Sequence, residues 1–233
     1  TITNCPENDT VSVAANCTHI MGDYTGLATY ADNCIPASSI VVAQVPLSGS
    51  LIGGNTSLTI TATDLAGNSE TCTFLVVPED NDPPTIFDCP SDITQDNDLS
   101  LCGAVVTYGP ITSIDNCAGV IVPQLDHGLA SGSIFDVGTT EVEYIADDGN
   151  GNTTSCVFDV TIIDAEDPVV LCPADITVNV DAGICGADVT YSLPTVTDNC
   201  PSPSTPALDA GLASGSTFPV GTTTNTYSST DGA

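Results

Sequence analysis

Cysteine and aspartate are the residue types in this chain whose number and spacing could support chemistry. Eleven cysteines follow a four-position pattern with a period of 83 to 85 residues: Cys5, Cys17, Cys34 and Cys72, then Cys89, Cys102, Cys117 and Cys156, then Cys172, Cys185 and Cys200. A fixed period of this length defines a repeating structural unit. No Cys-x2-Cys pair is present, so the spacing favours disulfides formed in an oxidising compartment over a zinc site.

The acidic side chains are the second candidate for chemistry. The chain has 30 Asp and Glu residues and no Lys or Arg, which gives a formal charge of −30. Binding to nucleic acid or to an anionic membrane needs cationic side chains, so both are excluded. Two interpretations of the carboxylates stay open, because they could form a solvated acidic surface or hold divalent cations.

Short alternating segments must position these residues. Residues 57–63, 156–162 and 187–191 alternate Thr, Ser or Asp with apolar side chains, and Gly, Pro, Asn and Asp separate such runs. This pattern predicts strands with one buried face, and about seven of them per repeat predict an antiparallel β-sandwich. No apolar run is long enough for a transmembrane helix. The predicted fold class is all-β.

Five motifs recur in register. Each repeat opens with Cys-Pro and carries Asp-Asn-Cys, and the second and third repeats share Cys-Gly-Ala, Gly-Leu-Ala-Ser-Gly-Ser and Val-Gly-Thr-Thr segments. The first two repeats end with a hairpin turn, at residues 64–68 and 148–152, and Asp231 is the counterpart in the third. Taken together, the motifs resemble the hyalin repeat (HYR) domain, found in tandem in large secreted surface proteins of Bacteroidota. The first repeat is divergent, with Cys17-Thr18-His19 in place of Cys-Gly-Ala.

The resemblance implies three immunoglobulin-like antiparallel β-sandwich modules, arranged end to end. The expected boundaries are 1–82, 83–166 and 167–233, with short acidic, proline-bearing linkers that act as stiff joints. The third module is expected to be incomplete, lacking its last strand and fourth cysteine, so the chain is expected to be a segment of a longer secreted protein.

The linkers are candidate calcium sites. Residues 80–83, Asp-Asn-Asp-Pro, resemble the acidic junctions at which cadherin-type modules bind calcium. In an immunoglobulin-like sandwich the Asp-Asn-Cys loop and the final hairpin both lie at the N-terminal end, so they should approach the linker. The candidate Ca²⁺ ligands are Asp80, Asp82, Asp115 and Asp148 at the first junction, and Asp164, Glu166, Asp167, Asp198 and Asp231 at the second. The alternative is that turns favour Asp at these positions.

Four cysteines per module permit three pairings. The first- and third-position cysteines should both lie near the N-terminal end of a module, which favours first-to-third and second-to-fourth bonds. The predicted pairs are Cys5–Cys34, Cys17–Cys72, Cys89–Cys117, Cys102–Cys156 and Cys172–Cys200, with Cys185 left unpaired.

Signatures of catalysis are weak. The two histidines, His19 and His127, lie in different repeats, which argues against a His-based triad or a two-His metal site. We therefore expect a non-enzymatic, extracellular structural or adhesive segment whose partners are neighbouring repeats, other copies in a fibre and a cell-surface or substratum ligand. Two alternatives stay open: a filament subunit assembled by strand complementation, and an accessory module of a secreted enzyme.

Overall fold

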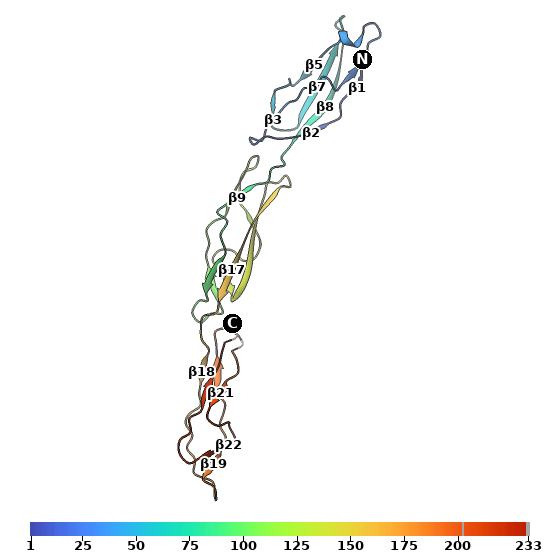
Figure 1. The fold of residues 1–233 in the computed structure, drawn as a ribbon. Coiled ribbons are helices and arrows are strands. Elements are labelled where there is room, and N and C mark those ends of the chain that lie inside the picture. The colour runs from blue at the N-terminus through green and yellow to red at the C-terminus, as the bar shows by residue number, and fades with distance from the viewer. Residues whose placement is uncertain (202, 232–233) are drawn as a thin grey trace. The chain divides into compact units, whose positions relative to one another are not determined.

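The computed structural model describes residues 1–201 and 203–231, and within them the protein is built of β-strands (Figure 1). The helical element in the described part is one 3₁₀ turn, η1 (Ala37–Ser39). The all-β prediction is confirmed. The described residues include no helix with the length and apolarity needed to span a membrane.

The strands fall into three sets that follow the cysteine period. The first set is β1 (Ile2–Asn4), β2 (Asp9–Ser12), β3 (His19–Ile20), β4 (Thr29–Tyr30), β5 (Val41–Val45), β6 (Leu51–Ile52), β7 (Thr56–Thr63) and β8 (Ser69–Glu79). The second set is β9 (Thr85–Phe87), β10 (Ile93–Asp96), β11 (Gly103–Val106), β12 (Thr112–Asp115), β13 (Gly119–Ile121), β14 (Gln124–His127), β15 (Ser133–Asp136), β16 (Gly138–Asp147) and β17 (Thr153–Ile163). The third set is β18 (Val169–Leu171), β19 (Gly186–Val189), β20 (Thr195–Thr197), β21 (Ala207–Ala210), β22 (Ser216–Pro219) and β23 (Thr226–Ser228).

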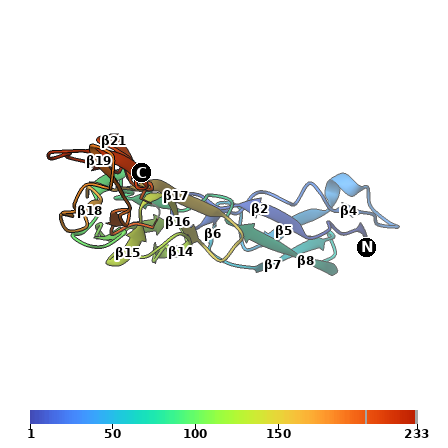
Figure 2. The same ribbon diagram turned by 90° about the horizontal axis from the view of Figure 1, so that it is seen from below.

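The first two repeats share one sheet plan. Each has a four-stranded sheet, ordered β2-β8-β7-β5 in the first and β10-β17-β16-β14 in the second. In both sheets the edge strand pairs in parallel with the long last strand, β2 with β8 and β10 with β17. Figure 2 shows strands β2, β5, β7 and β8 of the first of these sheets running across the view. Smaller sheets, such as β1-β4 and β9-β12-β13, complete the repeats.

Alternation along the long strands creates the cores, as the sequence predicts. In β7 the side chains of Leu58, Ile60 and Ala62 are buried, while the alternating Thr59, Thr61 and Thr63 are half-buried. Strand β17 likewise buries Phe158 and Val160. Burial of each Leu, Ile, Val or Phe side chain contributes roughly 1.5–3 kcal/mol, so each hairpin stabilises the core of its own repeat.

The predicted strand 187–191 is shorter in the structure, where β19 ends at Val189. The Tyr191 amide donates to Ser214 Oγ at 2.8 Å instead of continuing the ladder, which ends the strand. The glycine of the Cys-Gly-Ala motif has a steric cause. A Cβ on Gly103 would lie 2.5 Å from the Phe135 carbonyl oxygen on the paired strand β15.

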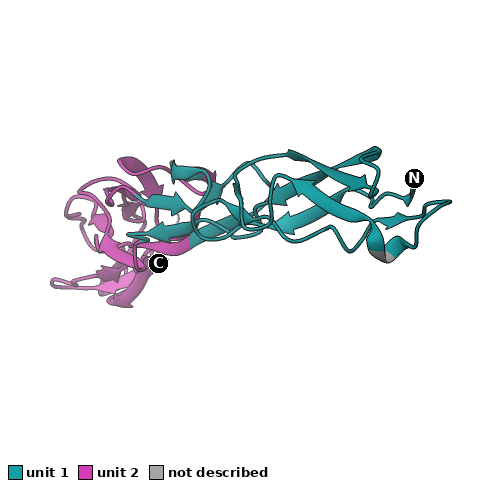
Figure 3. Ribbon diagram, turned by 90° about the horizontal axis from the view of Figure 1, so that it is seen from above, with its two compact units in different colours: residues 1–89, 111–124, 144–156 teal, residues 90–110, 125–143, 157–233 magenta. Residues whose placement is uncertain are grey.

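The chain divides into two compact units, coloured in Figure 3. The first unit contains residues 1–89, 111–124 and 144–156, and the second contains residues 90–110, 125–143 and 157–233. The first unit therefore holds the whole junction between the first and second repeats. The second unit holds the whole junction between the second and third repeats.

Candidate metal sites at the repeat junctions

The disulfides follow a rule different from the predicted one. The bonds are Cys5–Cys72, Cys17–Cys117, Cys89–Cys156 and Cys102–Cys200. Within a repeat, the first cysteine pairs with the fourth. Between repeats, the second cysteine of one repeat pairs with the third cysteine of the next. Cys34, Cys172 and Cys185 are exposed and form no disulfide among the residues described.

All five predicted pairs are therefore corrected: Cys5–Cys34, Cys17–Cys72, Cys89–Cys117, Cys102–Cys156 and Cys172–Cys200. The prediction assumed that bonding closes within each repeat. Cys72 lies in β8, whose N-terminal part contacts β1 next to Cys5, and this adjacency brings the two Cα atoms to 5.9 Å. The third-position cysteine instead faces the preceding repeat. Cys17 and Cys117, 100 residues apart, have their Cα atoms 4.8 Å apart.

The Asp-Asn-Cys loop has the same geometry at both junctions. Asp115 Oδ1 accepts hydrogen bonds from the amides of Cys117 at 2.8 Å and Ala118 at 2.7 Å. Asp198 Oδ1 accepts from the Cys200 amide at 2.8 Å. One carboxylate oxygen therefore holds the loop in shape, and the Oδ2 atom is left for another partner.

At the first junction three aspartates come together, each from a different segment. Asp80 lies in the linker, Asp115 at the end of β12 and Asp148 in the turn between β16 and β17. One carboxylate oxygen from each lies within 4.8 Å of the others. The Asn152 amide group donates to the Asp80 carbonyl oxygen at 3.0 Å, which fixes the linker against the hairpin. The fold thus places three like charges in one spot.

Hydrogen bonds explain why the Asp148 side chain stays ionised. Desolvation raises the pKa of Asp148, but bonds from Asn152 and Asn150 outweigh it and hold that pKa below its usual value. The Asn152 side chain donates to Asp148 Oδ2 at 2.7 Å. An anionic carboxylate is the form that a metal ion requires.

Buried oxygens without a hydrogen-bond partner among the described residues occur at both junctions. They are Asp80 Oδ2, Asp115 Oδ2 and Asn116 Oδ1 at the first, and Asp164 Oδ2, Asp198 Oδ2 and Asn199 Oδ1 at the second. The two sets occupy equivalent positions, 83 or 84 residues apart. Buried polar atoms are nearly always paired, so these six equivalent exceptions mark one position at each junction where an ion or a water would fit.

The second junction is built from the corresponding segments. Asp164 and Asp198 lie close together, and the Asn199 amide donates to the Leu101 carbonyl oxygen at 3.0 Å. Cys200 lies within the same group, but its sulfur is bonded to Cys102 and offers no thiolate. This group therefore supplies two carboxylates where the first junction supplies three.

The remaining candidate ligands lie outside these groups. Asp82 is exposed and accepts a long hydrogen bond, 3.5 Å, from Asn116. Glu166 is engaged elsewhere, because its Oε1 accepts from the Ser100 amide and from Asn97 at 3.3 Å. Asp167 is exposed, and Asp231 does not belong to either carboxylate group.

Sequence reasoning missed two further candidate oxygen ligands, the side chains of Asn116 and Asn199. The signal was present, since Asn stands beside the aspartate in every Asp-Asn-Cys motif. It could not be interpreted from sequence, because each asparagine lies next to a linker aspartate only in the folded chain: the side-chain amides of Asn116 and Asn199 donate to Asp80 and Asp164, both at 3.4 Å.

Comparison with known proteins gives a consistent picture. A family model described as "HYR domain" matches residues 79–162 and 163–233. Hyalin of Lytechinus variegatus is 34% identical over 207 residues, covering 85% of this chain and 38% of hyalin. Hyalin of Strongylocentrotus purpuratus is 33% identical over 183 residues, covering 76% of this chain and 15% of that protein. The chain thus spans well under half the length of these relatives.

These relatives are animal proteins, so the predicted Bacteroidota origin gains no support from them. Among solved structures, protocadherin gammaB7 EC3-6 matches with 13% identity and a TM-score of 0.34, covering 91% of this chain and 59% of that chain. Human CDH23 EC21-23 matches with 14% identity and a TM-score of 0.32, covering 92% and 88%.

Proposed function

The chain belongs to the HYR domain family, and on that premise we propose that it is a non-enzymatic, extracellular, adhesive or structural segment stiffened by calcium. Successive repeats are joined by one disulfide and one Ca²⁺ site at each junction. The observation that carries this proposal is the set of six buried, unpartnered oxygens at equivalent positions of the two junctions.

The partner of these oxygens must come from solution. The chain has no Lys or Arg, so no side-chain ammonium or guanidinium can neutralise the grouped carboxylates. The N-terminal ammonium lies elsewhere, 3.7 Å from Glu70. A bound cation would remove both the mutual repulsion of the aspartates and the cost of the unpaired oxygens.

Calcium fits the donor set better than transition metals. The available donors are carboxylate and amide oxygens, with no free thiolate or imidazole in either group. Hard oxygen ligands of mixed type, drawn from two loops and a linker, suit Ca²⁺ and its variable coordination number. The four disulfides support an oxidising, extracellular location.

Thermal unfolding of the full chain in Ca²⁺ and in EGTA tests the proposal. At a Ca²⁺ concentration 100 times the dissociation constant, each occupied site should raise the melting temperature by about 5–10 °C. The double variant Asp115→Asn, Asp198→Asn should lose most of this rise, whereas Asp159→Asn, away from the junctions, should keep it. Equal melting temperatures with and without calcium would disprove the calcium part.

A further inference from the structure

The first repeat presents, at its N-terminal face, the same residues that receive the linker at the first junction. These residues are Asp32, Asn33, Cys34, Asp64 and Asn68, and we call them the receiving face. They stand 83 or 84 residues before Asp115, Asn116, Cys117, Asp148 and Asn152. The equivalence extends from sequence to geometry.

The Asp-Asn-Cys loop of the receiving face is already formed. Asp32 Oδ1 accepts from the amides of Cys34 at 2.8 Å and Ile35 at 3.0 Å. The corresponding oxygen of Asp115 accepts at 2.8 and 2.7 Å. The loop therefore has its junction conformation with Cys34 unpaired.

The hairpin turn of the receiving face is formed as well. Asp64 Oδ1 accepts from the amides of Ala66 and Asn68, both at 2.8 Å, and the Asn68 side chain donates to Asp64 Oδ2 at 2.8 Å. The bond from Asn68 lowers the pKa of Asp64, as the equivalent bond from Asn152 does for Asp148. Both acidic arms of a junction, the Asp-Asn-Cys loop and the hairpin turn, are thus present in the first repeat.

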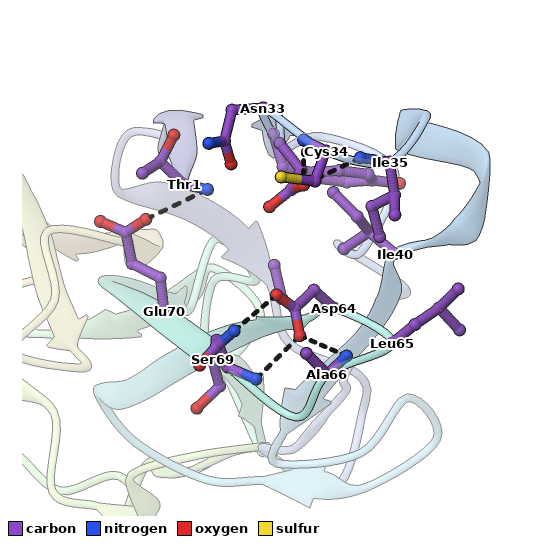
Figure 4. Close-up of a pocket in the computed structure, with 14 residues that line it drawn as sticks. Thr1, Asn33, Cys34, Ile35, Ile40, Asp64, Leu65, Ala66, Ser69 and Glu70 are labelled. Atoms are coloured by element: carbon purple, nitrogen blue, oxygen red, sulfur yellow. Dashed lines mark hydrogen bonds and ion pairs between the residues drawn. The ribbon is translucent and has the colours of Figure 1, made fainter.

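Between the two arms lies a cavity. It has a volume of about 730 Å³, and its lining includes Asp32, Asn33, Cys34, Asp64 and Asn68. Figure 4 shows Cys34 and Asn33 on one side of the cavity and Asp64 on the other. At the first junction, the space between the equivalent arms holds the linker residue Asp80.

We propose that the receiving face docks the C-terminal end of another HYR module. That module would supply its second-position cysteine to Cys34 and its linker aspartate to the cavity between Asp32 and Asp64. The partner is identified by the chain's own precedent, because Cys117 and Cys200 are bonded to second-position cysteines. The disulfide part stands on this precedent alone, while Ca²⁺ binding at the same face rests on the proposed function.

The bond formation balances with a disulfide as oxidant. Cys34 and the incoming cysteine each lose one hydrogen as their sulfurs join. A disulfide such as oxidised glutathione accepts both electrons and both protons, and is released as two thiols. The exposure of Cys34 gives the thiol access to this exchange.

The test uses the full chain preceded by an extra copy of its own residues 1–84, which keeps the natural Pro84-Thr sequence at the new junction. The extra copy carries Cys34→Ser, so that one Cys34 remains. The protein is refolded in a glutathione buffer, alkylated with iodoacetamide and digested with pepsin, because a chain without Lys or Arg has no trypsin sites. Mass spectrometry then identifies the linked peptides.

The expected result is a Cys17–Cys34 peptide, with Cys34 at least 10-fold less alkylated than in the parent chain. With Cys17→Ser in the extra copy, this peptide should vanish and Cys34 should become alkylated. The Cys17–Cys117 peptide is the internal control. Alkylated Cys34 beside an intact Cys17–Cys117 bond would overturn the docking proposal and leave the proposed function standing. A Cys17–Cys34 peptide that persists in the Cys17→Ser variant would overturn it as well.

Discussion

The two repeat junctions are built from equivalent residues, but they are not equally complete. Both have an inter-repeat disulfide and three buried oxygens that find no hydrogen-bond partner in the described part of the chain. The first junction adds a third carboxylate, that of Asp148, which stands in the turn of the long β16–β17 hairpin. The carboxylate group at the second junction contains two aspartates, Asp164 and Asp198.

The second and third repeats also differ in their cores, because the second buries more hydrophobic side chains. Strands β16 and β17 bury Val142, Ala146, Phe158, Val160 and Ile162 in the second repeat. Of the described hydrophobic residues in the third repeat, Ala187 is the buried one. The β16–β17 hairpin therefore has two effects. It closes the core of its own repeat and brings a ligand to the linker of the repeat before it.

The largest expected effect comes from breaking a junction disulfide. Cys17→Ser removes the Cys17–Cys117 bond, which connects residues 100 positions apart. The free energy of unfolding should fall by about 2–4 kcal/mol, because the bond restricts the unfolded chain. Guanidinium unfolding monitored by circular dichroism measures the change.

Cys34→Ser is the matched control for that variant, since Cys34 forms no disulfide among the described residues. Its stability should stay within about 0.5 kcal/mol of the parent. Equal losses in the two variants would show that the Cys17–Cys117 bond does not support the first junction.

The next effect sharpens the comparison of the repeat cores. Gly103→Ala should cost about 1–3 kcal/mol, because its Cβ would lie 2.5 Å from the carbonyl oxygen of the fully buried Phe135. Gly186→Ala meets the Phe218 carbonyl at 2.6 Å, but Phe218 is half-buried and can move, so the cost should be smaller. Chemical unfolding measures the loss in the free energy of unfolding for both variants. A larger loss for Gly186→Ala than for Gly103→Ala would contradict the prediction.

Calcium titration tests the difference between the junctions. Asp148→Asn should weaken binding at the first junction by about 10-fold or more, since it removes one of three carboxylates. Isothermal titration calorimetry should show two classes of site in the parent, with the tighter class weakened in the variant. Asp147→Asn, in the same hairpin but outside the group, should bind as the parent does. An unchanged isotherm for Asp148→Asn would remove Asp148 from the site.

The smallest expected effect is on the pH dependence of stability without calcium. The pKa values of Asp64 and Asp148 are lowered in the fold, so their contribution is complete above the ordinary Asp value of about 3.9. Stability should therefore fall as the pH drops below about 4 and the two carboxylates take up protons. Unfolding curves of the parent and of Asp64→Asn between pH 2 and 5 measure this, and the variant should show the shallower decline. Parallel curves would contradict it.

Part of the candidate site could be predicted from residue types and register. The repeat alignment placed Asp80, Asp115 and Asp148 at one junction, and the structure brings these three together. Asp82, Glu166 and Asp167 are candidate ligands by sequence because they are linker acids. In the structure Asp82 and Asp167 are exposed, and Glu166 accepts hydrogen bonds from Ser100 and Asn97. Proximity in sequence could not tell which linker acid turns inward.

By itself, the sequence determined the repeat period, the all-β class and the strand alternation, because these follow from residue spacing and local side-chain preference. It also determined that any positive charge at the junctions, beyond an N-terminal amine or the two histidines, must come from solution, since no Lys or Arg exists. Tertiary structure alone decided the disulfide pairing and the set of buried oxygens. A cysteine bonds to whichever cysteine the fold brings within reach, and at each junction that partner belongs to the neighbouring repeat.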